Sequence, residues 1–324
     1  MHFLFDLVLS VLAAGVVLAL FSSLVAYAVE RYFVPPGDWL EVDGERIHYR
    51  SLGQGPAIVL VHGLAGQMMN FDYLPLQQLA QRWRVILLDR PGSGRSPRRD
   101  EGKAGIAAQA HLVAGFIRAL DLPQPPLLVG HSLGGAIALG VALREPGCIA
   151  GLALIAPLTH FTPHVPAPFR AMAIRTPWLR RLFGRVLAVP LAIVTSYPTL
   201  AAVFGPEAVP RDFPLRGGGL LTLRPVAYVG ASTDLNAVEA DLPQQQARYG
   251  ELRLPVRILY GDRDRVLDWR AQGEALRAQV PQAELQLVPG AGHMLPVTQV
   301  AATTAWLEAA ARAMFAGIGQ HPGQ

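Results

Sequence analysis

Residues Pro125–Ala136 read PPLLVGHSLGGA, an apolar run that breaks into the G-x-S-x-G sequence Gly130–Gly134. A serine at a sharp turn from a buried strand into a helix needs neighbours without side chains, and here a glycine stands two residues away on each side. Such a turn presents the hydroxyl of Ser132 at the end of a sheet and at the N-terminus of a helix, whose dipole favours developing negative charge. The segment therefore predicts a nucleophilic serine; a serine that only caps the helix is the structural alternative.

Short apolar runs recur on both sides of this segment and alternate with stretches of helical periodicity. A strand that is buried on both faces has such a sequence, so the alternation predicts a largely parallel sheet with helices on both faces. The expected strands are 57–61, 85–88, 127–129, 152–155, 256–260 and 285–288, after a hairpin over 39–51 that turns at Asp43-Gly44. The expected helices are 73–81, 107–120, 133–143, 270–280 and 298–314.

The alternation stops between residues 157 and 254, in a segment rich in proline, arginine and apolar residues. This segment is too long for a plain connection, so we expect it to form a cap over the active-site end of the sheet. Within it, residues 170–189 interleave arginines with apolar side chains. The pattern is typical of an amphipathic helix at a membrane surface, or of a cap helix with its apolar side on a pocket and its arginines in solvent. Both interpretations predict an apolar pocket.

Residues 1–34 are expected to form a single transmembrane anchor. The stretch Leu7–Val29 carries no charge and is long enough for one helix to span a bilayer. A cleaved signal peptide is one alternative, because Ala26-Tyr27-Ala28 offers a small-x-small site, although no Lys or Arg precedes the apolar run. A buried core helix is the other, and it would have to be apolar on every face. The sequence does not assign the side of the membrane on which the rest of the chain lies.

Four motifs together resemble the α/β-hydrolase superfamily, in its serine-nucleophile branch of esterases and lipases. In chain order they are VHGL at 61–64, DRPGSGRS at 89–96, GHSLGG at 130–135, and GDRD at 261–264 with GAGH at 290–293. The resemblance covers about residues 39–315 and implies an α/β-hydrolase fold. With the cap and the anchor, the expected organisation is an anchor at 1–34, a core at 38–157 and 254–316, a cap at 158–253 and a flexible tail at 317–324.

The resemblance implies the chain order nucleophile, acid, histidine. Ser132 is the expected nucleophile. His293 is the expected base, since only His293 and His321 follow a plausible acid and His321 is the fourth residue from the end of the sequence. The family's usual spacing favours Asp264 as the acid that orients the imidazole, with Asp262 as the alternative.

Acyl transfer also needs two N–H groups directed at the oxygen of the tetrahedral intermediate. One is expected at Leu133, directly after the nucleophile, and similarity to the family assigns the other to Leu64. His62 and His131 are expected to have structural roles, the first in hydrogen bonding its loop and the second in the wall of the pocket. Asp89 is expected to accept hydrogen bonds from nearby backbone N–H groups.

The activity implied is hydrolysis of carboxylic esters with lipophilic acyl groups, without a metal or an organic cofactor. The expected partners are a small acyl ester or lipid and, through the N-terminal helix, a membrane. The net charge of +4 does not indicate nucleic acid, because Lys103 is the only lysine and the arginines are spread along the chain. With Cys148 as the single cysteine, an internal disulfide and a cysteine metal cluster are excluded.

Other activities stay open. A serine at position 132 argues against haloalkane dehalogenases and epoxide hydrolases of this superfamily, which use an aspartate nucleophile. A carbon–carbon bond hydrolase or a perhydrolase would use the same three residues. A non-catalytic, membrane-tethered binding protein of the same fold is the alternative of a different class, and it would not need all three residues in order.

Overall fold

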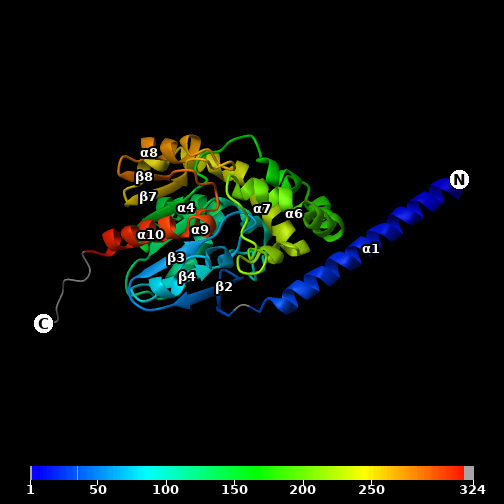
Figure 1. Ribbon diagram of the computed structural model, residues 1–324, viewed down its shortest axis with the longest axis horizontal. Helices are drawn as coiled ribbons and strands as arrows, with labels where there is room; N and C mark the ends of the chain where they lie inside the picture. The colour runs from blue at the N-terminus through cyan, green and yellow to red at the C-terminus, as the bar shows by residue number, and fades with distance from the viewer. Residues whose placement is uncertain (1, 35, 317–324) are drawn as a thin grey trace.

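The computed structural model describes residues 2–34 and 36–316, so the expected tail at 317–324 lies outside the described residues. In these residues an eight-stranded sheet carries helices on both faces, and further helices lie over one edge. A long N-terminal helix runs past these further helices and projects from the molecule (Figure 1). This is an α/β-hydrolase fold, as expected.

The apolar runs form the sheet, in the strand order β1-β2-β4-β3-β5-β6-β7-β8. Strand β2 is antiparallel to both of its neighbours, and all other pairs are parallel. Every residue of β3, β5 and β6 is buried, which is why their sequences are apolar without alternation. The strands are β1 Asp38–Val42, β2 Glu45–Leu52, β3 Ala57–Val61, β4 Arg84–Leu88, β5 Leu127–His131, β6 Gly151–Ile155, β7 Val256–Gly261 and β8 Ala283–Val288.

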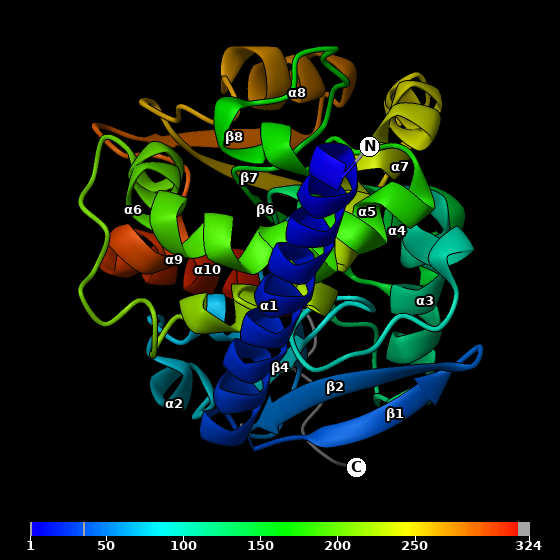
Figure 2. The same ribbon diagram turned by 90° about the vertical axis from the view of Figure 1, so that its right-hand side faces the viewer.

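Helices α3 and α4 cover one face of the sheet and α10 covers the other (Figure 2). The core helices are α2 Leu76–Leu79, α3 Ile106–Ala119, α4 Leu133–Arg144, α8 Ala275–Gln279, α9 Leu295–Thr298 and α10 Val300–Phe315. Short 3-10 or π turns lie at η1 Met68–Phe71, η2 Glu101–Ala104, η3 Pro146–Cys148, η7 Tyr249–Glu251 and η8 Arg270–Glu274. The expected helix 73–81 shrinks to one turn, because Pro75 precedes it and the chain must enter β4 at Arg84.

The segment between β6 and β7 forms helices that cover the carboxyl edge of the sheet. They are η4 Ala167–Met172, α5 Pro177–Phe183, η5 Gly184–Ala188, α6 Val189–Phe204, η6 Gly219–Thr222 and α7 Pro225–Gln246. The expectation of one helix over 170–189 is wrong. Thr176 is extended before Pro177, since a residue that precedes proline avoids the helical region, and α5 starts anew. Arg180 is also buried rather than solvated.

The N-terminal helix α1, His2–Tyr32, is long and apolar enough to cross a membrane. The continuous helical stretch Pro177–Phe204 of the cap passes the same test of length and composition. All side chains of residues 2–14 are exposed, so a buried core helix does not describe this segment. Helix α1 fits a membrane anchor or a signal sequence.

Candidate active site

Ser132 follows β5 directly and precedes α4, with backbone angles φ 54° and ψ −121° that residues other than glycine rarely adopt. The chain is tightly packed at this turn. A Cβ on Gly130 would lie 2.4 Å from the carbonyl oxygen of Gly134, and one on Gly134 would lie 2.2 Å from that of Val61. The two glycines of the motif are therefore required by close backbone approach, and the conformation is that of a nucleophile elbow.

Asp264 and His293 follow β7 and β8, and the structure brings these two side chains together. Nδ1 of His293 lies 2.7 Å from Oδ2 of Asp264, and both side chains are buried. The other oxygen of Asp264 accepts hydrogen bonds from the N–H groups of Val266 and Leu267 at 2.8 and 3.0 Å. Asp262 is used differently, because its Oδ1 accepts the Gly290 N–H at 2.6 Å and closes a turn. The geometry thus favours Asp264 over Asp262 as the partner of the histidine.

The two expected oxyanion amides lie beside the serine for topological reasons. Strand β3, which leads into Leu64, pairs with β5, which leads into Ser132 and Leu133. Within the described residues, no hydrogen bond to a protein acceptor involves the N–H of Leu64 or that of Leu133. Two free N–H groups at the carboxyl edge of adjacent strands, one of them at a helix N-terminus, suit an oxygen that becomes negative.

The expected structural roles of the two neighbouring histidines are confirmed. His62 donates from Nδ1 to the carbonyl oxygen of Gly63 at 2.9 Å and accepts the Arg90 N–H at Nε2 at 3.0 Å. Burial, with the nearby Arg90 guanidinium, lowers the pKa of His62 to about 3. Nε2 of His131 lies 3.1 Å from the carbonyl oxygen of His293. Burial, together with the neighbouring His293, lowers the pKa of His131 to about 3. Both rings are neutral at physiological pH.

Asp89 has the expected supporting role in the loop after β4. Its carboxylate accepts the N–H groups of Met68 and Arg95, each at 2.9 Å, and also contacts the ring of His48 at 3.2 Å. Burial alone would raise the pKa of Asp89, but the hydrogen bonds from the ring of His48 and from the two N–H groups hold it below its usual value. The carboxylate is therefore a fixed structural anion.

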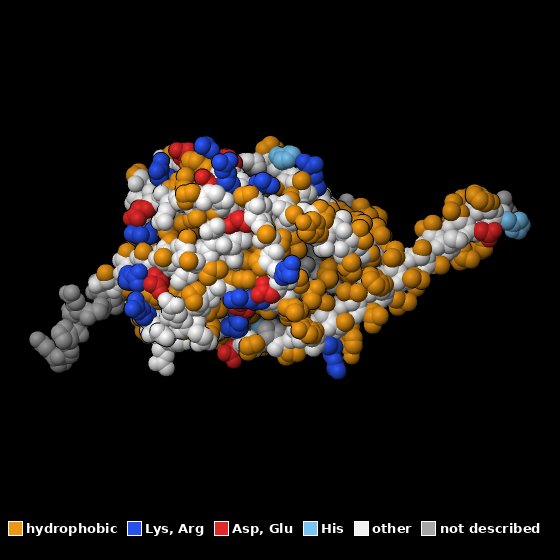
Figure 3. Space-filling view, in the orientation of Figure 1, with side chains coloured by type: hydrophobic (Ala, Val, Ile, Leu, Met, Phe, Trp, Pro, Cys, Tyr) orange, Lys and Arg blue, Asp and Glu red, His pale blue; other side chains and the backbone are white. Residues whose placement is uncertain are grey.

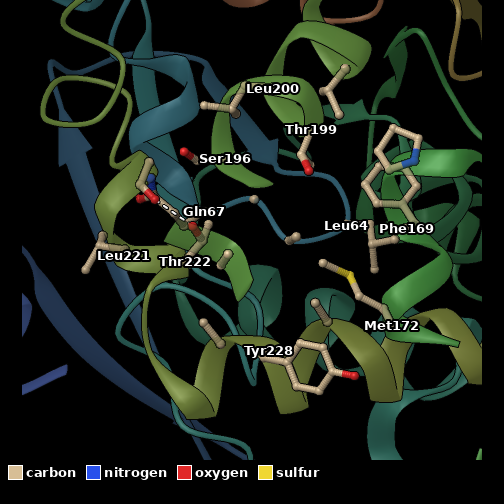
Figure 4. Close-up of a pocket in the computed structure, with 18 of the residues that line it drawn as sticks. Leu64, Gln67, Phe169, Met172, Ser196, Thr199, Leu200, Leu221, Thr222 and Tyr228 are labelled. Carbon is tan, nitrogen blue, oxygen red and sulfur yellow. Dashed lines mark hydrogen bonds between the residues drawn. The ribbon is translucent and has the colours of Figure 1, made fainter. Parts of the chain in front are cut away.

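A cavity of about 600 Å³ lies between the core and the cap (Figure 4). Its floor is formed by core residues, among them Leu64, Ser132 and His293. The cap supplies the walls, which are mainly apolar. Lining residues from η4, α6, η6 and α7 include Phe169, Met172, Leu200, Leu221 and Tyr228. The serine and the histidine thus open into one lipophilic space.

Two cap-to-core connections were not predicted from the sequence. Asp234 of α7 binds Nη1 of the buried Arg90 at 2.7 Å, while the same guanidinium donates to the carbonyl oxygens of His62 and Gly63, next to Leu64. Arg98 binds the other oxygen of Asp234 at 2.5 Å. This network fixes the loop after β3, which contains His62, Gly63 and Leu64, to the cap.

The second connection is Glu207, which follows α6. Its carboxylate accepts the N–H of Gly292, directly before His293, at 2.9 Å, and the side chains of Thr298 and Gln299 at 2.8 and 2.5 Å. Residues 158–206 contain no Asp or Glu, and Glu207 is the first acidic residue after them. Its isolation was the only feature of the sequence that could have singled out Glu207. Within the described residues, no group of three His, Cys, Asp or Glu side chains is arranged to hold a metal ion.

The comparisons with known proteins identify the family of the chain. A family model described as alpha/beta hydrolase fold matches residues 56–299, and the chain belongs to this family. A pimeloyl-[acyl-carrier protein] methyl ester esterase of Chromobacterium violaceum is 32% identical over 248 residues, which cover 75% of this chain and 89% of that protein. A 2-(acetamidomethylene)succinate hydrolase of Mesorhizobium japonicum is 27% identical over 252 residues, 76% of this chain and 84% of that protein.

Among solved structures, a membrane phospholipase A, a bacterial virulence factor, superimposes with a TM-score of 0.69 at 23% identity. The match covers 99% of both chains. At this identity the likeness shows the fold alone. Together, the family and its esterase and lipase neighbours support a hydrolase.

Proposed function

We propose that this protein is a membrane-anchored serine hydrolase that cleaves carboxylic esters with lipophilic acyl groups. One observation carries the proposal: Ser132, in its strained turn, and His293, bonded at 2.7 Å to Asp264, share the floor of one apolar cavity. A serine needs an adjacent base, and the base needs a group that fixes its tautomer. A purely binding protein has no use for the three groups in this arrangement.

The proposed reaction begins with attack of the Ser132 hydroxyl oxygen on the ester carbonyl carbon, while Nε2 of His293 takes the proton. Asp264 holds Nδ1–H and stabilises the imidazolium. The N–H groups of Leu64 and Leu133 bind the oxyanion. His293 then protonates the leaving alcohol, which leaves an acyl-serine. Water, deprotonated by the same imidazole, releases the carboxylic acid and regenerates the hydroxyl.

The walls of the cavity and helix α1 support a lipophilic substrate and a membrane location. Side chains such as Phe169, Met172 and Leu200 offer an acyl chain contacts but few hydrogen bonds. The esterase relative and the lipase-like neighbours support the same class of substrate. Helix α1 would hold the enzyme as a single-pass protein next to lipid esters.

The test uses the full chain in detergent micelles or vesicles with p-nitrophenyl esters from acetate to palmitate. We expect hydrolysis that Ser132→Ala lowers by about 10⁴-fold or more. The matched control is Ser196→Ala, the same change in a serine that also lines the cavity, which should stay within a few-fold of the wild type. The chain length that is hydrolysed fastest measures the acyl pocket.

A fluorophosphonate probe separates the alternatives. Labelling of Ser132 without hydrolysis of any ester would move the assignment to carbon–carbon hydrolysis or perhydrolysis with the same residues. If Ser132 were not labelled and no ester were hydrolysed, a binding protein would be the remaining interpretation, and the proposed function would be wrong.

A further inference from the structure

The second half of α1 is packed against the cap. Its covered side chains recur at spacings of three and four residues, so they form one stripe along the helix. The central member, Ser22, is completely buried, and α1 contacts η5, α6, η6 and α7 along this stripe. Figure 2 shows α1 crossing the cap between α5 and α6. The stripe consists of Gly15, Leu18, Ala19, Ser22, Val25, Ala26, Val29 and Phe33.

Specific contacts fix the C-terminal end of α1 to the wall of the cavity. Val29 and Phe33 pack against Leu221 of η6, which lines the cavity. Arg95 donates a hydrogen bond to the carbonyl oxygen of Phe33 at 2.8 Å. The largely buried Arg224 lies 3.6 Å from Glu30. Helix α1 is therefore docked on the cap and is not a free tether.

This docking leaves too little of α1 free to cross a bilayer. The freely projecting part, residues 2–14, rises about 20 Å at 1.5 Å per residue, while a hydrocarbon core is about 30 Å thick. At least about 10 Å of the docked part must then lie within the hydrocarbon, and a tilt of the helix increases this depth. The cap elements that flank it must enter the membrane to the same depth.

The surface of the cap beside α1 suits that environment. Apolar side chains dominate the surface around α1 and α6, whereas charged side chains gather over the core (Figure 3). Tyr197 and Val194 of α6 are 80% and 79% exposed, and Trp178 of α5 is 64% exposed. Such a large exposed apolar area next to a membrane helix is expected where a protein lies in the interface.

We propose that the face of the cap formed by α5, η5 and α6 is immersed in the outer part of one lipid leaflet, and that substrate enters the cavity directly from that leaflet. The proposal rests on the proposed anchoring and ester hydrolysis, and it specifies the substrate as a membrane lipid ester.

The open side of the cavity lies on this face. Seven of the lining residues are themselves exposed, and six of them lie on η4 and α6. They are Ala167 and Ala171 on η4, Leu191, Ile193, Thr195 and Ser196 on α6, and Thr222 on η6. The cavity thus has its mouth between η4 and α6, and α6 also carries the exposed Val194 and Tyr197. An acyl chain that enters through this mouth meets mainly apolar side chains between the leaflet and Ser132, with the hydroxyls of Thr195 and Ser196 on one side of the mouth.

The depth of the cap is measured with the full chain in phosphatidylcholine vesicles whose acyl chains are brominated near the headgroup. Bromine quenches a tryptophan only on contact, and Trp178 is isolated by subtraction of the Trp178→Phe variant. The same background with Tyr197→Trp reports on α6. We expect both positions to be quenched. Absence of quenching at both, with the protein still floating with the vesicles, would overturn the proposal.

The route by which substrate enters the cavity is tested by comparing hydrolysis of a soluble ester with hydrolysis of an ester carried in vesicles. The double variant Val194→Asp/Tyr197→Asp changes two residues that do not line the cavity, so hydrolysis of monomeric p-nitrophenyl butyrate should stay at the wild-type rate. Hydrolysis of a long-chain ester carried in vesicles should fall by about tenfold or more, because charged side chains are expelled from the leaflet. Ala305→Asp, on the exposed face of α10, is the control and should change neither rate.

Equal rates of vesicle hydrolysis in the double variant and the wild type would also overturn the proposal. Its failure differs from failure of the proposed function, in which the wild type would hydrolyse neither ester while quenching of Trp178 would still report on immersion. Recovery of a protein that begins after Ala28 would overturn both the anchor and the immersion.

Discussion

The core and the cap contain similar apolar side chains and use them in opposite ways. In β3, β5 and β6 every residue is buried, and the candidate nucleophile Ser132 directly follows β5. In the cap, Val194 and Tyr197 of α6 are about four-fifths exposed, although the helical stretch Pro177–Phe204 that contains them is as apolar as a membrane span. A hydrophobic sequence therefore does not by itself say that a segment is interior. In the core the apolar groups face one another; in the cap several of them, such as Trp178, Val194 and Tyr197, face outward and leave a surface for another apolar phase.

The largest expected effect separates two aspartates at the carboxyl edge of the core. Asp264→Asn should lower kcat by about 10⁴-fold, because the amide can hold the imidazole in the wrong tautomer. Asp262→Asn, which changes a turn residue bonded to Gly290, should stay within about tenfold of the wild type. Rates with a soluble ester measure both. Similar losses in the two variants would contradict the assignment of the acid.

The next effect concerns the connection between core and cap. Asp234→Ala leaves Arg90 and Arg98 buried without their counterion, so we expect the free energy of unfolding to fall by about 3–5 kcal/mol. The control is Glu239→Ala on the same helix, which breaks an exposed pair with Arg175 and should cost about 0–1 kcal/mol. Urea unfolding in micelles measures both. If the two variants were equally stable, the bonds of Asp234 to Arg90 and Arg98 would not stabilise the attachment of the cap to the core.

A smaller effect is expected from pH and arises in the core. Burial lowers the pKa of His62 and His131 to about 3, whereas the unfolded chain protonates them near pH 6.5. The unfolded state thus binds more protons, and between these values each histidine lowers the unfolding free energy by about 1.4 kcal/mol per pH unit of acidification. On acidification, the unfolding free energy of His131→Gln should therefore fall by about 1.4 kcal/mol less per pH unit than that of the wild type. The unfolding free energy of both proteins is measured with denaturant between about pH 6 and about pH 4. If it changed with pH equally in the wild type and in His131→Gln, His131 would not be a buried neutral histidine with a lowered pKa.

The smallest effect contrasts two adjacent arginines of the cap. Arg181 is 60% exposed and lies 2.9 Å from Glu101, so Arg181→Ala should cost less than about 1 kcal/mol. Arg180 is buried, where it donates to Thr233 and to backbone carbonyls, and Arg180→Ala should cost about 1–3 kcal/mol. Thermal unfolding of the two variants measures the difference. An equal cost would mean that burial in the cap contributes little.

The core could be predicted because its signals are local. The expected strands begin and end within two residues of those found, since burial on both faces leaves an apolar run with sharp ends. Gly130 and Gly134 marked the serine turn for a steric reason: a Cβ at Gly130 would meet the motif's own Gly134, and one at Gly134 would meet Val61 at the end of the neighbouring strand. The pairing of Asp264 with His293 was predicted from chain order, and its distance needed the structure.

The cap could be predicted in position but not in form. The proline that starts α5 was visible, yet the pattern over 170–189 suggested one helix. Arg180 could not be distinguished from Arg181 by sequence, because its burial depends on Thr233, 53 positions away. Asp234 and Glu207 were missed for the same reason: each acts on a core loop that is distant in the chain.

Glu207 connects the cap to the loop that carries His293, the candidate base. Its carboxylate binds the Gly292 N–H and also Thr298 and Gln299, so it ties the segment after α6 to the residue before His293 and to the C-terminal end of α9. If α6 lies in a leaflet as proposed, the lateral pressure of the surrounding lipids acts on a helix that is connected through Glu207 to Gly292, the residue before His293. Thickening or stiffening of the membrane would then change the rate of the chemical step as well as the supply of substrate, and the enzyme would respond to the mechanical state of the bilayer that holds it.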